Sequence, residues 1–342
     1  MGSVLKSLGV ELPVVAAPMA GGPSTPALVA AVARAGGLGF LAAGYRTAQR
    51  MSEEIAGVRA TASAFGVNLF APNPLPVGLS AFRTYARALQ PVADRFGVMV
   101  ESAEPVEDDD DWAAKIDVLI RDPVPVVSFT FGIPDGGTVA RLRAGGSLVI
   151  QTVTSADEAR RARDAGVDAL AAQASVAGGH WGTLTPQQPP ATMPLAQLTG
   201  AVIAASELPV IAAGGVTDTE QVRDLLGIGA EAVAVGTLLL RADESGASDV
   251  HKAALVEARG EPVLTRAFTG RPARGLPNEF IRRYDELAPF GYPAVHHLTS
   301  GLRKAAAAAG DPEWVNLWAG VGYRAATAEP AEVIVRRLSA AL

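Results

Sequence analysis

One histidine stands at a position where a reactive base would be useful. His180 lies in the stretch AAQASVAGGHWG (171–182), directly after two glycines and a run of small apolar residues. Imidazole has an ordinary pKa of about 6.5, so it can accept and release protons near neutral pH. Because a histidine at the tip of a flexible glycine turn adds nothing to folding, His180 is either a solvated surface residue or a base held over a ligand.

Two glycine turns late in the chain have the pattern of an anion site. The segments PVIAAGGV (209–216) and AVAVGT (232–237) both contain an apolar run that leads into glycine. Glycine lets backbone N–H groups approach an anion at the start of a helix. Either turn alone would fit an ordinary tight turn, but the two together predict a phosphate-binding site.

Three other side chains stand at the ends of apolar runs. Met19 lies in APMAGGPST (17–25), Asn68 lies in VNLFAPNP (67–74), and Gln173 ends an alanine-rich run. Met19 fits simple core packing and Asn68 fits an amide bonded to backbone, so both have a structural interpretation beside a ligand-binding one. For Gln173 a ligand contact is favoured, because an amide there costs stability unless it meets a partner.

The elements that must position these residues alternate along the chain. Helix-like patterns separate most of eight short apolar runs, and most of these runs are close to continuous. The runs cover residues 13–18, 38–43, 66–70, 125–131, 147–153, 168–173, 209–213 and 232–236. Continuous apolar runs are typical of parallel strands buried on both faces. Eight of them predict an α/β fold, a (β/α)8 barrel of the TIM type, in which ligands bind at the carboxyl ends of the strands.

The regular alternation of strand-like and helix-like patterns breaks at two places, so we predict that the chain has three parts. We expect residues 1–240 to form the barrel with an insertion around 71–122, residues 241–326 to form a helical cap, and residues 327–342 to form a final helix on the barrel wall. The insertion holds the acidic run EDDDD (107–111). Like charges at this density repel, so we expect that run to be a solvated loop and helix start.

The composition excludes several classes of protein. The chain of 342 residues has a net charge of −6 and a pI near 5.4, which argues against nucleic-acid or anionic-membrane partners. No apolar run approaches the roughly 20 residues of a membrane span, and no signal peptide is recognisable, so we expect a cytoplasmic protein. The chain has no cysteine, and its four histidines lack metal-ligand spacing. We therefore expect no metal site, and we expect His296 and His297 to be a surface pair of the cap.

Six segments, taken in order along the chain, resemble one enzyme family. They are APMAGG (17–22), VNLF (67–70), QASVAGGH (173–180), AAGGV (212–216), VGT (235–237) and LWAGVGY (317–323). Over most of the chain they are similar to the nitronate monooxygenases, formerly called 2-nitropropane dioxygenases. The resemblance implies FMN held without a covalent bond, no metal, and His180 as the catalytic base. The residues that it places at FMN are Met19, Asn68, Gln173, Gly178, Gly179, Gly214, Gly215, Val235, Gly236 and Thr237.

The resemblance also implies an activity. It is the oxidation of alkyl nitronates, such as propionate 3-nitronate, or of nitroalkanes with O2 to a carbonyl compound and nitrite, which would serve detoxification. We expect a monomer or homodimer, with a small substrate and O2 as partners. In the cap, Tyr292, Lys304 and Tyr323 are candidates for recognising the substrate anion. One departure is Ala234, where the family commonly has glutamine, so any contact there must come from the backbone.

Other activities stay open on the sequence alone. An NAD(P)H-dependent FMN reductase, acting on quinones or on enoyl-acyl-carrier proteins, shares parts of these segments, although LWAGVGY and the long cap favour the monooxygenase. Dehydrogenases that need a cysteine are excluded, because the chain has none. A non-redox lyase or isomerase could use the same phosphate site, but we identify no lysine or carboxylate at a predicted strand end. A protein that binds FMN without turnover is a further alternative.

Overall fold

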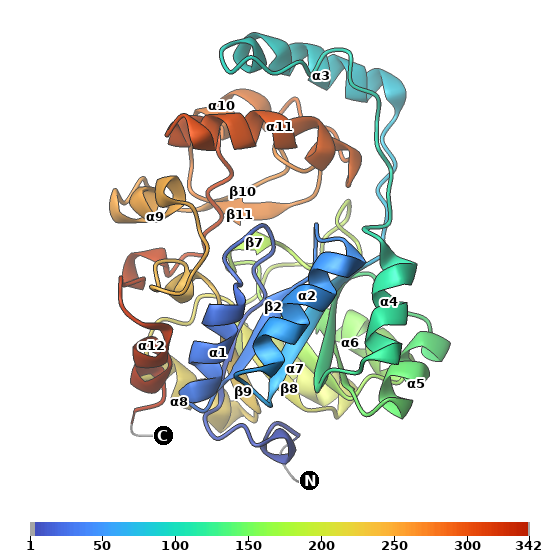
Figure 1. Cartoon of the computed structure of the whole chain (residues 1–342), viewed down its shortest axis with the longest axis vertical. Helices are drawn as coiled ribbons and strands as arrows, with labels where there is room; N and C mark the ends of the chain where they lie inside the picture. The colour runs from blue at the N-terminus through green and yellow to red at the C-terminus, as the bar shows by residue number, and fades with distance from the viewer. Residues whose placement is uncertain (1–3, 341–342) are drawn as a thin grey trace.

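Eight parallel strands close into a barrel in the computed structural model, which describes residues 4–340 (Figure 1). In chain order the strands are β1 (Val14–Ala16), β2 (Leu38–Ala42), β3 (Phe65–Ala71), β4 (Val126–Phe131), β5 (Leu148–Val153), β6 (Ala169–Gln173), β8 (Val210–Ala213) and β9 (Ala232–Val235). Strand β1 pairs with β9 as well as with β2, and this pairing closes the barrel. Each predicted apolar run overlaps one of these strands, so the predicted (β/α)8 barrel is confirmed. Residues 1–3 and 341–342, which the predicted barrel and final helix include, lie outside the described residues.

Helices cover the outside of the barrel. They are α1 (Pro26–Arg34), α2 (Ala48–Arg59), α4 (Trp112–Arg121), α5 (Gly136–Ala144), α6 (Ala156–Asp164), α7 (Leu195–Ser206), α8 (Thr219–Ile228) and α12 (Ala331–Leu338). Their buried faces pack on the strands in two apolar clusters, which include Ile55 and Leu198 in one and Leu225 and Ile334 in the other. The last helix, α12, packs against α1 and α8.

Apolar side chains fill one end of the barrel's interior. Phe40, Ile150 and Ile211 meet there, and Leu5 and Val10 from the N-terminal segment pack against them. Full burial of such a side chain stabilises the fold by about 1.5–3 kcal/mol. Because this end is filled, a ligand has to enter at the other end, where the strands have their carboxyl termini.

A cap covers the carboxyl ends of the strands (Figure 1). It contains the helices α9 (Asp249–Val256), α10 (Glu279–Tyr284) and α11 (Ala294–Ala308) and a small sheet of β10 (Val263–Thr265), β11 (Ala273–Gly275) and β7 (Gly179–His180). The 3-10 turns η2 (Thr237–Leu239), η3 (Pro312–Trp314) and η4 (Tyr323–Ala325) connect these elements, and η1 (Lys6–Leu8) lies near the N-terminus.

The predicted insertion around 71–122 divides between the two parts of the molecule. Its helix α3 (Leu79–Asp94) packs on α11, and Phe82 and Tyr85 join the apolar core of the cap. In Figure 1, α3 lies at the top of the cap, far from the barrel. Its second helix, α4, packs instead on the barrel helices α2 and α5. We propose that α3 belongs with 241–326 to the cap, and that the rest of the predicted division holds.

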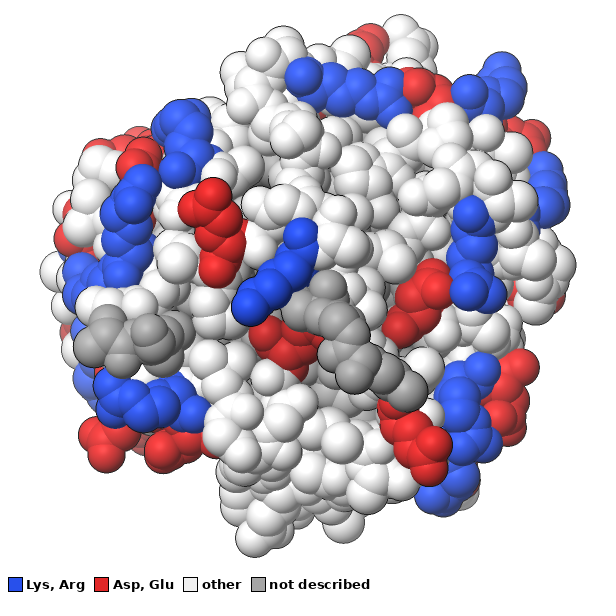
Figure 2. All heavy atoms as spheres, turned by 90° about the horizontal axis from the view of Figure 1, so that it is seen from below, with Lys and Arg blue, Asp and Glu red and all other residues white. Residues whose placement is uncertain are grey.

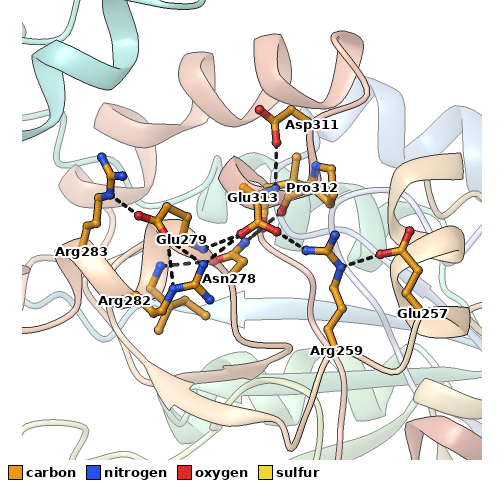
Figure 3. Close-up of polar contacts among 11 residues, drawn as sticks. Glu257, Arg259, Asn278, Glu279, Arg282, Arg283, Asp311, Pro312 and Glu313 are labelled. Carbon is orange, nitrogen blue, oxygen red and sulfur yellow. Dashed lines mark hydrogen bonds and ion pairs between the residues drawn. The ribbon is translucent and has the colours of Figure 1, made fainter.

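A polar network centred on Glu313 joins separate segments of the cap (Figure 3). Its carboxylate accepts hydrogen bonds from Arg259 and, at 2.8 Å, from the backbone N–H of Glu279. Arg282 reaches the carboxylates of both Glu279 and Glu313, at 2.6 and 3.4 Å. Burial alone would raise the pKa of Glu313, but the hydrogen bonds from Arg259 and Glu279 outweigh burial and lower it. The cap is therefore fixed by charge-assisted hydrogen bonds as well as by its apolar core.

The lower face of the molecule has no extended area of one charge. Figure 2 shows positive and negative side chains interspersed on the face that is seen from below. Among residues 4–340, none of the helices combines the length and the apolar character that a membrane crossing needs.

Candidate active site

A cavity of about 1400 Å³ lies between the strand ends and the cap. Most of the residues that the sequence predicted for the site line it. They are Met19, Asn68, Gln173, Gly178, Gly179, His180, Gly214, Gly215, Val235, Gly236, Thr237, Tyr292 and Lys304. The structure therefore brings together residues that come from many different strand ends, as a barrel does.

Tyr323 does not reach this cavity. Its ring is 1% exposed, lies in the apolar core of the cap, and its hydroxyl donates to the carbonyl oxygen of Gly260 at 2.9 Å. The turn η4 directs the side chain into the cap and away from the barrel, so its prediction as a substrate contact is wrong. Tyr292 and Lys304 differ in position: the ring of Tyr292 is 5.8 Å from the ring of His180, whereas Lys304 is exposed.

His180 is part of a strand and does not stand at a flexible loop tip. Strand β7 pairs antiparallel with β11, which places His180 opposite Ala273. The amide of Gln173 donates from Nε2 to the carbonyl oxygen of His180 at 3.1 Å and accepts from the N–H of Gly182 at 2.6 Å. Gln173 thus finds its partners in the backbone of this segment, and it fixes His180 against the end of β6.

The hydrogen bond of His180 determines which ring nitrogen is free. Its Nε2 is 2.9 Å from the Oγ1 of Thr269, and that hydroxyl donates its own proton to the carbonyl oxygen of Arg271 at 3.1 Å. With its own proton on that carbonyl oxygen, Thr269 accepts from Nε2, and we therefore assign the proton of the neutral ring to Nε2 and treat Nδ1 as an acceptor. Within residues 4–340, Nδ1 has no hydrogen-bond partner and is not sealed off from the cavity.

The surroundings of His180 keep its ring neutral. Burial lowers its pKa to about 3, and the positive charges of Arg271 and Arg303 act in the same direction. At neutral pH the ring is uncharged, and the lone pair of Nδ1 is available to take a proton.

Two cations, Arg271 buried beside the cavity and Arg303 half-buried in its lining, make the cavity attractive to anions. Arg271 is fully buried, donates to the carbonyl oxygen of Thr183 at 2.6 Å, and lies 4.0 Å over the ring of Phe131. Arg303 lines the cavity and donates to Asn316 at 2.9 Å. Burial lowers the pKa of each arginine to about 10, so both stay charged at neutral pH. Neither forms an ion pair with a carboxylate in the described part of the chain, so an anion in the cavity would be stabilised.

The predicted phosphate site has free backbone donors. The N–H groups of Gly215, Val216, Gly236 and Thr237 have no hydrogen-bond partner among the residues that the structure describes. Gly215 has a φ of +77°, a conformation that other residues rarely adopt. A Cβ on Gly236 would lie 3.4 Å from the sulfur of Met19, which is an ordinary contact distance. Four convergent donors beside the start of η2 suit the oxygens of a phosphate group.

Asn68 has a different partner from the one that the sequence suggested. Its Nδ2 donates to the hydroxyls of Ser128 at 2.9 Å and Thr130 at 3.1 Å, so side chains and not backbone satisfy it. These residues come from β3 and the neighbouring β4. Asn68 thus links two barrel strands through its side chain and also lines the cavity.

Several cavity residues were not predicted from the sequence. His296 lines the cavity and stacks on Tyr45 with ring centroids 4.0 Å apart, whereas His297 pairs with Asp108 at 2.8 Å. The expected surface pair of histidines is therefore wrong for His296. A signal was present, because His296 and Arg303 are seven residues apart in α11, which places them on one helix face.

The acidic run also differs from the expectation. Asp110 accepts from the N–H of Tyr45 at 2.9 Å and pairs with the buried Lys115 at 2.7 Å, and Asp111 accepts from the N–H of Ala48 at 2.8 Å. The run is not simply a solvated loop, because these two carboxylates fix it to the start of α2. Within residues 4–340, no group of three or more histidine, aspartate or glutamate side chains is arranged to hold a metal ion.

Comparison with known proteins assigns the chain to a family. Residues 3–340 match the family described as nitronate monooxygenase. The chain belongs to the nitronate monooxygenase family. A probable nitronate monooxygenase from Staphylococcus aureus (strain Newman) is 38% identical over 337 residues, which are 97% of this chain and 94% of that protein. The oxidoreductase predicted from the six segments is therefore confirmed at the level of the family.

Two solved structures are similar to that of this family member. A nitroalkane oxidase from Streptomyces ansochromogenes is 46% identical, with a TM-score of 0.92 over 99% of this chain and 97% of that chain. FabK from Thermotoga maritima is 28% identical, with a TM-score of 0.75 over 98% of this chain and 94% of that chain. The barrel and its cap are thus shared with both of these proteins.

Proposed function

We propose that this member of the family is an FMN-dependent monooxygenase that oxidises alkyl nitronates, including nitronates formed in the site from neutral nitroalkanes. The observation that carries the proposal is the neutral ring of His180, with Nδ1 open to a cavity that Arg303 lines and that has the buried charge of Arg271 behind the ring of Phe131. This combination suits a reaction in which a carbon acid becomes an anion.

The free backbone N–H groups of the predicted phosphate site suit the phosphate group of FMN. Its phosphate would accept from the N–H groups of Gly215, Val216, Gly236 and Thr237, and the neighbouring residues Met19, Asn68 and Gln173 would lie along the remainder of the cofactor. When bound, FMN would accept electrons from the nitronate and allow reaction with O2. The protein's own part is to position the substrate, to move a proton and to stabilise negative charge.

His180 would remove the proton from a neutral nitroalkane. The C–H bond next to the nitro group breaks, the proton moves to Nδ1 of His180, and the electron pair forms the C=N bond of the nitronate. The negative charge then rests on the nitro oxygens. Because the pKa of His180 in the free site is low, proton transfer to it is unfavourable by itself. The charges of Arg271 and Arg303 make the transfer more favourable by stabilising the anion that is formed.

Replacement of His180 tests this role. In His180→Asn we expect FMN to stay bound and kcat/KM for a neutral nitroalkane to fall by about 100-fold or more, because a general base contributes this much. A preformed nitronate needs no deprotonation, so its oxidation should fall far less. Nitrite release measured with both substrates distinguishes the two effects. Equal activity of His180→Asn and the wild type on the neutral nitroalkane would remove the proposed base.

Small nitro compounds and O2 are the partners that this proposal implies. The physiological substrate, exemplified above by propionate 3-nitronate, belongs to the proposal, as does the role in detoxification. The cytoplasmic location and the monomer or homodimer stay predictions from the sequence.

A further inference from the structure

His296 is held in the cavity by contacts on two sides. Its ring lies flat on the ring of Tyr45, with an interplanar angle of 2°. From the next turns of the same helix, the Nη2 of Arg303 donates to Nδ1 of His296 at 3.2 Å and to its carbonyl oxygen at 3.1 Å. Arg303 is itself fixed, because it donates to Thr299 at 3.0 Å and to Asn316 at 2.9 Å.

These contacts determine where the proton of His296 lies. A guanidinium group has only donors, so Nδ1 of His296 must accept, and the single proton of the neutral ring is on Nε2. Across residues 4–340, Nε2 finds no hydrogen-bond partner, and it is not sealed from the cavity that the ring lines. The free nitrogen of His296 is therefore a donor, while the free nitrogen of His180 is an acceptor.

We propose that His296 is a binding residue for the substrate anion, donating from Nε2 to a nitro oxygen of the nitronate, and that Arg303 is the positioning residue that fixes this tautomer. The inference rests on the proposed function. When His180 takes the proton from carbon, the negative charge moves to the nitro oxygens, where the N–H of His296 receives it without giving up its own proton. His180 and His296 thus act as acceptor and donor on one substrate.

The charged groups around His296 are consistent with a neutral donor. Burial and the charge of Arg303 lower its pKa well below the ordinary value, and the neighbouring His297, His180 and Lys304 act in the same direction. Two tyrosines also contact the ring: Tyr45 stacks on it, and the ring centroid of Tyr292 lies 6.4 Å away. Burial raises the pKa of both, that of Tyr45 to about 12, so both stay neutral as well. The donor is therefore unaffected by pH across the neutral range.

The test compares variants of the FMN-loaded protein by two measurements. The first is the binding of sodium nitrite, a small planar anion, followed by the change in the visible spectrum of the flavin. The second is kcat/KM for a preformed nitronate. His296→Phe keeps a flat ring on Tyr45 but has no N–H. The affinity for nitrite and the kcat/KM for the nitronate should therefore each fall by about 10-fold to 100-fold. His296→Gln, which keeps an N–H donor, should recover part of the loss. His297→Gln is the matched control: it lies next to His296 on the cavity wall, but its ring bonds to Asp108, so both quantities should stay within about 2-fold because a partly exposed contact of this kind contributes little.

Arg303→Gln provides a measurement that a purely structural role would not change. Without the guanidinium, Nδ1 of His296 can take a proton and its pKa should rise, while burial, the larger cause of the lowered pKa, still holds it below the ordinary value of about 6.5. Nitrite binding to Arg303→Gln should then strengthen as the pH falls below that value, whereas in the wild type it should be independent of this group.

Each outcome of these measurements decides between the two proposals. Equal nitrite binding and equal kcat/KM in His296→Phe and the wild type would overturn the role of His296, and so would a wild type that binds no nitrite. If the wild type binds nitrite through His296 but oxidises no nitronate, the proposed function fails and the anion-binding role stands. Thermal midpoints and the bound flavin of each variant show whether the protein is folded.

Discussion

At the scale of single residues, the proposed chemistry depends on which nitrogen of each histidine carries the proton. Thr269 accepts a hydrogen bond from Nε2 of His180, and Arg303 donates a hydrogen bond to Nδ1 of His296. One ring is left with a free acceptor and the other with a free donor. The chemistry of the site thus depends on residues that do not themselves face the reacting carbon.

Thr269→Val tests this dependence for His180. Valine has nearly the same shape but no hydroxyl, so the N–H at Nε2 loses its acceptor and the ring can place its proton on Nδ1 instead. We expect kcat/KM for a neutral nitroalkane to fall by about 10-fold, as for the loss of one hydrogen bond of about 1.4 kcal/mol. Thr269→Ser keeps the hydroxyl and should stay close to the wild type. Equal activity of the valine and serine variants would show that Thr269 does not set the tautomer.

At the scale of elements, the strands were predictable and some of their partners were not. Continuous apolar runs are a local property, so the eight strands and the glycine turns after β8 and β9 could be found from the sequence. The position of β7 could not, because its two residues pair with β11, which is distant in the chain. For the same reason α3 looked like part of an insertion, and only its packing on α11 places it in the cap.

Gly236→Ala tests the phosphate site after β9. The φ of Gly236 is −115°, which alanine adopts readily, and its Cβ would meet Met19 and Ala17 at ordinary contact distances. The barrel should therefore fold, but the methyl group would occupy space beside the free N–H donors. We expect the affinity for FMN to fall by about 10-fold, measured by titrating the flavin-free protein.

The matched control is a glycine far from the cavity. Gly227 lies in α8, and a Cβ there would have open space. Gly227→Ala should keep the affinity for FMN and gain roughly 0.5–1 kcal/mol in stability from the better helix residue. Unchanged affinity in Gly236→Ala would contradict the proposed position of the phosphate.

At the scale of the whole molecule, three histidines are kept uncharged: His251 is buried, and His180 and His296 are half-buried. Burial lowers the pKa of His180 to about 3 and of His251 to about 4, and the pKa of His296 lies well below its ordinary value. In the unfolded chain each would take a proton near a pH of about 6.5. Below that pH the unfolded state binds more protons than the native state, so stability falls as the pH falls from about 6.5 toward the native pKa values.

His251→Gln isolates one of these contributions. His251 donates from Nε2 to the carbonyl oxygen of Trp318 at 2.9 Å, and glutamine can supply a similar N–H. Each buried neutral histidine contributes up to about 1.4 kcal/mol of lost stability per pH unit. Urea unfolding between about pH 6.5 and about pH 4.5 should therefore show a shallower loss of stability in His251→Gln than in the wild type. An identical pH dependence in both proteins would mean that the native His251 is already protonated.

The resemblance to a family identified more of the site than the residue patterns alone. The ten candidate FMN residues and His180 all line one cavity, whereas the cap candidate Tyr323, which the resemblance did not supply, has its side chain in the cap core, and His296 was not a candidate. The direction of a side chain in a cap of irregular turns depends on tertiary packing, which the segment LWAGVGY does not contain.

The most direct test of the central claim is an anaerobic reduction of the purified, FMN-loaded protein. Propionate 3-nitronate and NADH are added in separate cuvettes, the visible spectrum is followed, and air is then admitted. The account predicts that the nitronate bleaches the flavin, that NADH does not, and that nitrite appears when O2 enters. Rapid bleaching by NADH together with no reaction of the nitronate would contradict it and would make the protein an NAD(P)H-dependent reductase on the same barrel.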